Sequence, residues 1–242
     1  KGEADLLDDY FLKYLIYSGL GHVYAHTLPD YAMEYYAQAL EYAQSINTPK
    51  QVAFSCIASS SIDLARMYNK RGEKQLSIEY YNKAAKTANE NNEYLKQALS
   101  LKELATIYRK LKDPHKALFY MKEVMRIEKL HHVDVGPVNY LTLGKIYYEL
   151  NQLDSAITNY EKAIESPNIR TKAGTYTSLF YAYKKKGEHQ QAAKYLEKGW
   201  ILKDSIAKAE KNEVLIEMQE KYDQQQIINE KNELEIKKNQ TK

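Results

Sequence analysis

Two histidines spaced four residues apart are the first candidate for chemistry in this chain. His22 and His26 would lie on one face of a helix, where two imidazoles can share a metal ion. The sequence places no third ligand beside them, and the single cysteine, Cys56, has no second cysteine for a zinc site or an internal disulfide. We therefore expect no metal site, and we interpret His22 and His26 as polar residues of a binding surface and Cys56 as a small core residue.

The sequence motifs of catalysis and nucleotide binding are incomplete. Gly19-Leu20-Gly21 lacks the third glycine and the preceding strand of a dinucleotide loop, and Gly144-Lys145 lacks the rest of a phosphate-binding loop. The chain contains neither an HExxH nor a GxSxG motif. We expect no enzymatic activity and no cofactor.

The composition favours an α-helical protein. Nine glycines and five prolines in 242 residues are too few for the frequent turns of a β-sandwich or barrel. No apolar run approaches the roughly 20 residues that a membrane-spanning helix needs. Lys and Arg (35) nearly balance Asp and Glu (32), so the net charge of +3 gives no sign of a nucleic-acid-binding surface. We expect an all-α chain without direct nucleic-acid binding.

One pattern of residues recurs five times. Leu, a small residue and Tyr fall at i, i+1 and i+4 on one helix, and Ala, an aromatic residue and Ala follow at i, i+4 and i+7 on a second helix. The key tyrosines of the five copies are Tyr24, Tyr68, Tyr108, Tyr147 and Tyr183. The small residue lets the two helices approach closely, and stacked pairs share one core. The pattern predicts helical hairpins near residues 14–46, 58–90, 98–130, 137–168 and 173–203.

This pattern resembles the tetratricopeptide repeat family over about residues 5–203. The resemblance implies a right-handed α–α superhelix of about five hairpins that binds proteins or peptides. Successive key tyrosines are 44, 40, 39 and 36 residues apart, above the standard period of 34. Such spacing resembles kinesin light chains and peptide-responsive bacterial regulators. Phe180 replaces the small residue in the fifth copy and Met121 the aromatic residue in the third, so we expect local differences in packing there.

The resemblance also implies a set of groove residues, because in the family the first helix of each hairpin lines the concave face. Carried over to this chain, the groove contains His22, His26, Arg66, Asn69, Lys70, Lys102, Arg109, Lys145, Tyr148 and Tyr181. Cations dominate this set, so we expect a basic groove that binds an acidic protein or peptide segment. Arg66, Asn69, Lys102, Arg109 and Lys145 resemble in type the residues with which some family members hold a terminal carboxylate. For Lys70, at a helix end, the alternative is that it complements the helix dipole.

Twenty-three tyrosines are more than the repeat pattern uses. Those outside the pattern either pack elsewhere in the core or offer amphipathic contact area to a peptide. The sequence leaves both interpretations open.

Residues 204–242 form a polar segment without glycine or proline and predict one long terminal helix. Leu215, Met218 and Tyr222 follow a, d, a spacing, which indicates either a cap on the last repeat or a coiled-coil linker that could dimerise the intact protein. The element Glu220-Lys221-Tyr222-Asp223 resembles the segment that precedes a membrane span in some bacterial repeat proteins.

Two functional hypotheses follow. In the first, the chain is the ligand-sensing region of a bacterial signalling or transcriptional regulator, periplasmic and membrane-anchored, with a membrane span or output domain after residue 242. In the second, it is a cytoplasmic scaffold, adaptor or peptide-responsive regulator. In both, ligand capture would change the curvature of the array, and the terminal helix would transmit that change.

Overall fold

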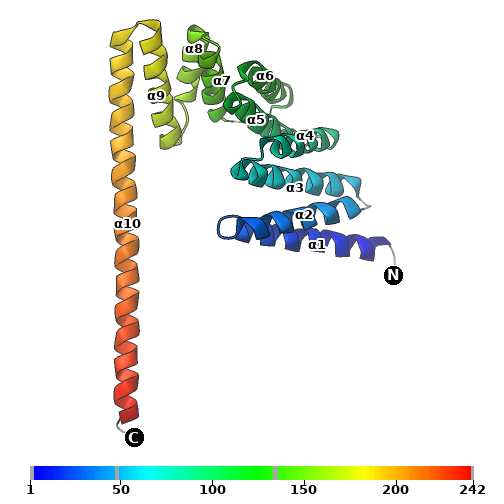
Figure 1. Cartoon of the computed structure of the whole chain (residues 1–242), viewed down its shortest axis with the longest axis vertical. Helices are drawn as coiled ribbons and strands as arrows, with labels where there is room; N and C mark the ends of the chain where they lie inside the picture. Colours follow the sequence, from blue (N-terminus) through cyan, green and yellow to red (C-terminus); the bar gives the residue numbers. More distant parts are fainter. Residues whose placement is uncertain (1–2, 47–48, 133–135, 241–242) are drawn as a thin grey trace. The chain divides into compact units, whose positions relative to one another are not determined.

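The computed structural model describes residues 3–46, 49–132 and 136–240, and within these ranges it contains ten α-helices and no strand (Figure 1). The chain divides into two compact units, Lys1–Ala163 and Ile164–Lys242. We call these parts unit 1 and unit 2.

Unit 1 is a stack of four helical hairpins. Its hairpins are α1 (Glu3–Tyr24) with α2 (Pro29–Ser45), α3 (Lys50–Arg71) with α4 (Lys74–Glu90), α5 (Tyr94–Lys110) with α6 (Pro114–His131), and α7 (Val138–Glu149) with α8 (Leu153–Ala163). Each hairpin also contacts the next one, through α2–α3, α4–α5 and α6–α7. The predicted all-α repeat solenoid is confirmed.

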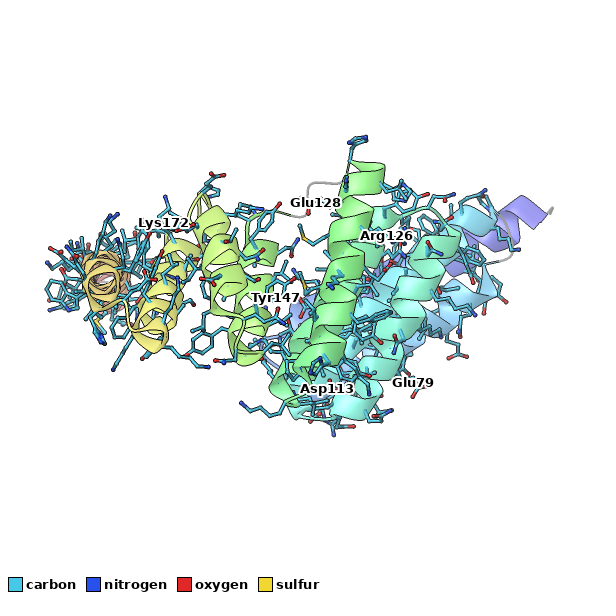
Figure 2. All side chains as sticks on the ribbon, turned by 90° about the horizontal axis from the view of Figure 1, so that it is seen from above. Glu79, Asp113, Arg126, Glu128, Tyr147 and Lys172 are labelled. Atoms are coloured by element: carbon cyan, nitrogen blue, oxygen red, sulfur yellow. The ribbon has the colours of Figure 1, made fainter. Side chains whose placement is uncertain are left out.

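The turn inside a hairpin has the same geometry in four of the five repeats. The residue four positions after the key tyrosine adopts a left-handed backbone conformation, with φ of +87° at Gly72, +63° at Lys112, +60° at Asn151 and +86° at Gly187. The next N–H donates to the carbonyl of the key tyrosine, as in the 2.9 Å bond from Asp113 to Tyr108, and this bond closes the helix end. Asp113 also accepts a hydrogen bond from the backbone N–H of Lys116 and so caps α6 (Figure 2).

The small residue of the repeat pattern lies where the two helices come closest. A Cβ atom added to Gly21 would lie 2.5 Å from the ring of Tyr36, and one added to Gly144 would lie 2.5 Å from the ring of Tyr160. The predicted close approach is therefore confirmed for the first and fourth hairpins. Met121, which replaces the aromatic residue of the third, is fully buried.

Four tyrosines that the repeat pattern did not explain are packing residues. The key tyrosine of a hairpin stacks on a tyrosine of the second helix, with ring centroids 5.4–5.6 Å apart. The pairs are Tyr24–Tyr35, Tyr68–Tyr80, Tyr108–Tyr120 and Tyr183–Tyr195. Stacked aromatic pairs stabilise the hairpin by about 0.5–1.5 kcal/mol beyond their burial. Of the two interpretations left open by the sequence, packing within the hairpin holds for Tyr35, Tyr80, Tyr120 and Tyr195, which are partly buried.

Unit 2 consists of α9 (Ile169–Lys186) and α10 (His189–Gln240). Helix α10 is 52 residues long, which corresponds to about 78 Å. It runs without a break past residue 203, where the sequence analysis placed the start of a separate terminal helix. No glycine or proline follows Gly199 in α10, so no helix-breaking residue ends the helix near residue 203. An ion pair of 2.8 Å between Arg170 and Glu210 extends the contact between α9 and α10 beyond residue 203. Figure 2 shows α10 nearly end-on, with side chains projecting on all sides.

Candidate functional site

The predicted groove residues come almost entirely from the first helices of the hairpins in unit 1. Helices α1, α3, α5 and α7 carry eight of them, and His26 lies in the turn directly after α1. Tyr181 lies on α9 in unit 2, where its side chain is half exposed. The candidate site is therefore built from the residues of unit 1.

A buried carboxylate joins the first three helices. Asp63 on α3 is only 8% exposed, and its carboxylate lies 3.2 Å from the guanidinium of Arg66 and 3.7 Å from Nε2 of His22. The other ring nitrogen of His22, Nδ1, is 2.8 Å from the hydroxyl of Tyr36 on α2. Burial raises the pKa of Asp63, while His22 and Arg66 oppose this shift. His22 and Arg66 therefore act first as internal partners of Asp63.

The same cluster affects the neighbouring tyrosines. Burial and the charge of Asp63 raise the pKa of Tyr36 to about 12. Burial, with the charge of Glu103 as the next cause, also raises the pKa of Tyr81 on α4. Both phenols thus stay protonated at neutral pH.

A second charged cluster joins α5 and α7. Arg109 Nη1 lies 2.8 Å from the carboxylate of Glu149, and both side chains are partly buried. Arg109 Nε is also buried and has no hydrogen-bond partner among the described residues. Partial burial and the charge of Arg109 lower the pKa of Lys145, whereas Glu149 opposes the shift. Glu149 is thus the one carboxylate that offsets the charges of both Arg109 and Lys145. It forms an ion pair with Arg109, whereas Lys145 has no hydrogen bond or ion pair in the part of the chain that the structure describes.

The other predicted residues have different surroundings. Asn69 accepts a 2.7 Å hydrogen bond from Lys74 and so holds the turn between α3 and α4. Lys70 is exposed in the last turn of α3, where a cation complements the helix dipole. Lys102 lies 3.8 Å from Glu103, and Tyr148 is half-buried near the C-terminal end of α7. The structure thus brings Arg109 and Lys145 together, and separately His22 and Arg66.

Sequence reasoning missed Asp63 and Glu103. The count of cations on the first helices overlooked both carboxylates, which pair with His22, Arg66 and Lys102. Asp63 and Glu103 therefore offset part of the positive charge of Arg66 and Lys102, whereas Arg109 and Lys145 have only the carboxylate of Glu149 between them among the described residues. The sequence offered one signal for Asp63, which is its position between the apolar residues Ile62 and Leu64. An acid that is buried with such neighbours requires a cation partner.

Among the described residues, no three His, Cys, Asp or Glu side chains are grouped so that they could hold a metal ion. No helix within the described ranges has both the length and the apolar character of a membrane span.

Comparison with known proteins identifies the repeats. Sequence profiles described as "Tetratricopeptide repeat" match residues 56–129 and residues 138–168. These stretches correspond to the second and third hairpins and to the fourth. No curated protein matches the chain in sequence.

Solved structures show the same fold at low sequence identity. BtubC (BKLC) from P. vanneervenii superposes with a TM-score of 0.66 and 18% identity, covering 86% of this chain and 93% of that one. A MamA protein gives 0.59 and 21% over 81% and 94% of the two chains. A putative kinesin light chain of Podosopora anserina gives 0.60 and 16% over 83% and 97%. At these identities the likeness concerns the fold alone. The two profile matches and the recurring hairpin geometry show that the chain contains tetratricopeptide repeats, a fold that supports a protein-interaction module.

Proposed function

We propose that unit 1 binds a peptide or protein segment and that Arg109 and Lys145 hold an acidic group of this ligand. The observation that carries the proposal is the unbalanced charge between α5 and α7, where two partly buried cations share the carboxylate of Glu149. A ligand carboxylate placed there would pair with the charged amine of Lys145 and lie in the field of the Arg109 guanidinium.

Partial burial makes this pair a better anchor than an exposed lysine. The lowered pKa of Lys145 shows that its charged form is disfavoured by its surroundings, so an anion that approaches it restores the stability of that form. Arg109 is held in place by Glu149 and loses little side-chain entropy on binding. The half-buried ring of Tyr148 offers apolar contact area on α7, the helix that carries Lys145.

The test is a binding assay with defined peptides. The full chain is screened against an array of random nonapeptides, each synthesised with a free C-terminal carboxylate and as the matching amide, with acidic side chains at varied positions. The affinity of the best binder is then measured by calorimetry for the wild type, Lys145→Gln and Arg109→Gln. We expect each variant to bind about 10-fold more weakly, since a hydrogen bond to a charged group contributes about 1.5–3 kcal/mol.

The matched control is Lys122→Gln, which removes an exposed cation from the second helix α6. It should bind as the wild type does. Equal affinity of all four proteins for an acidic peptide, or an array that yields only binders without acidic groups, would contradict the proposal.

We also propose that the intact protein is a bacterial sensor whose unit 1 captures the ligand and whose terminal helix connects to an output domain, dimerising along that helix. Support comes from the length of α10, from the resemblance of Glu220–Asp223 to segments that precede a membrane span, and from the basic pair described above. This proposal places the chain in the periplasm. The second candidate is a cytoplasmic scaffold or adaptor, which the structural likeness to a putative kinesin light chain favours.

A further inference from the structure

Two positions that are buried or partly buried in the earlier repeats are exposed in the fifth. The residue four after the first small residue of the pattern in the second helix, Ala or Ser, is Tyr36, Tyr81, Met121 or Tyr160 in the first four hairpins, each at most 3% exposed. The same position in the fifth is Leu196, which is 52% exposed. Four residues later, Leu40 and Ala85 are buried in the first two hairpins and Met125 and Ile164 are partly buried in the next two, whereas Trp200 is 67% exposed in the fifth. The end of the array therefore presents apolar side chains that a further helix would normally cover.

These exposed side chains border a cleft between α9 and α10. The cleft has a volume of about 150 Å³, and its lining includes Phe180, Tyr181, Leu196, Trp200 and Lys203. Phe180 occupies the place of the small repeat residue. Lys184 lies over its ring, with Nζ 5.8 Å from the centroid, so lysines flank the cleft on both helices. A partner segment that fits this cleft needs apolar side chains for its lining and acidic side chains for the two lysines at its borders.

The distal part of α10 has this character. Val214, Met218 and Tyr222 follow each other at intervals of four residues and are 49%, 63% and 60% exposed. Glu213, Glu220 and Asp223 accompany them, against Lys221 as the one cation from Glu213 to Asp223. Five helical turns of 3.6 residues equal 18 residues, which is the spacing from Leu196 to Val214 and from Trp200 to Met218. The cleft residues and the distal residues thus lie on one side of the same helix.

We propose that two copies of this chain pair reciprocally, with the segment Glu213–Asp223 of each copy packed into the cleft of the other. The helices α10 then run antiparallel, so that Trp200 of one copy meets Met218 of the second and the acidic segment lies against Lys184 and Lys203. A two-fold axis forms this contact twice. It therefore buries the cleft and the distal apolar residues of both copies, and no unpaired copy of either surface is left to bind a third chain. The inference specifies the self-association proposed above and does not depend on the ligand of unit 1.

Trp200 is the chain's single tryptophan and reports directly on this contact. Sedimentation equilibrium and tryptophan emission are recorded on the full chain over a range of concentrations from about 0.1 to 100 μM. We expect the mass to double from 28.1 kDa. We also expect the emission of Trp200 to shift to shorter wavelength over the same concentration range, because the indole leaves water.

Two exposed residues of the distal segment provide the matched variants. Met218→Glu should weaken the dimer at least about 100-fold and keep the emission at long wavelength, because two-fold symmetry buries the unpaired charge twice. Ile216→Glu changes a residue of similar exposure, 61% against 63%, on the opposite side of the helix, and should leave both readings unchanged.

Three results would overturn the inference. A mass of 28.1 kDa at every concentration excludes the dimer. A dimer whose tryptophan emission does not shift indicates pairing elsewhere, such as a parallel coiled coil of the distal segments. Equal effects of Met218→Glu and Ile216→Glu show that this side of α10 is not the contact. None of these results bears on peptide binding by Arg109 and Lys145.

Discussion

Asp63 is the residue whose role depends most on its surroundings. In the sequence it is an acid between Ile62 and Leu64, and nothing near it predicts that it contacts His22 on another helix. In the structure it is buried, faces His22 and Arg66, and influences the pKa of Tyr36 and Tyr81. A carboxylate in this position couples the stability of the first two hairpins to pH.

The expected pH dependence follows from the raised pKa of Asp63. Burial is the largest cause of the shift, so the folded state holds the proton more tightly than the unfolded state, where the pKa is near 3.8. The contribution of this group to stability is thus fully present below that pH and is lost as pH rises through the higher folded pKa. We expect the unfolding free energy of the wild type, relative to Asp63→Asn, to fall as pH rises from about 3.5 to about 7.

Urea denaturation of both proteins at several pH values measures this difference. Asp30→Asn is the control, because Asp30 is 87% exposed and its ion pair with Arg71 at 3.5 Å is screened by solvent. That variant should follow the wild type at all pH values. A relative stability of the wild type that rises with pH would mean that His22 and Arg66 outweigh burial, and that the assigned direction of the pKa shift is wrong.

At the scale of elements, the small residue of each first helix sets the distance to the second helix. Gly19 and Gly21 lie two residues apart on α1 and differ in this respect. A Cβ atom at Gly21 would lie 2.5 Å from the ring of Tyr36, whereas one at Gly19 would meet nothing within 4 Å. We expect Gly21→Ala to lower the stability by about 1–3 kcal/mol, because the ring must move in a packed core.

Gly19→Ala is the matched control on the same helix. It should raise the stability by about 0.5–1 kcal/mol, because alanine loses less backbone entropy than glycine in a helix. Thermal unfolding followed by circular dichroism compares both variants with the wild type. If the two substitutions shift the melting temperature in the same direction, the contact between Gly21 and Tyr36 does not govern the packing of this hairpin.

At the scale of the whole molecule, the proposed sensor role makes a prediction about location. The intact protein, tagged and expressed from its own gene, should be found in the membrane fraction, resist extraction by high salt and be released by detergent. A membrane-spanning segment outside residues 1–242 would anchor it through the hydrophobic effect, which salt does not weaken.

Residues 1–242 alone, with the same tag and a host-matched promoter, serve as the control and should be absent from the membrane fraction. Digestion by a protease added to cells with a permeabilised outer membrane then tests the periplasmic location. Recovery of the intact protein in the soluble cytoplasmic fraction would contradict the sensor proposal and favour the scaffold.

The sequence by itself determined the repeat architecture. The spacing of Leu, small residue and Tyr on one helix, and of Ala and aromatic residue on the next, depends on contacts within one hairpin, and such local contacts recur wherever the residues recur. The positions of the turns at Gly72 and Gly187 follow for the same reason, since glycine adopts positive φ without strain. The ten groove residues stay a prediction that rests on the family resemblance.

Only the tertiary structure decided which charges meet. Arg109 and Glu149 are 40 residues apart and His22 and Asp63 are 41 apart, so their contacts arise from the stacking of hairpins and leave no periodic signal in the sequence. Neither the excess of positive charge at Arg109 and Lys145 nor the balance at Arg66 could be derived from a count of cations. The exposure of Leu196 and Trp200 likewise depends on what covers them in space, because the same positions hold apolar or aromatic residues that are buried or partly buried in the earlier repeats.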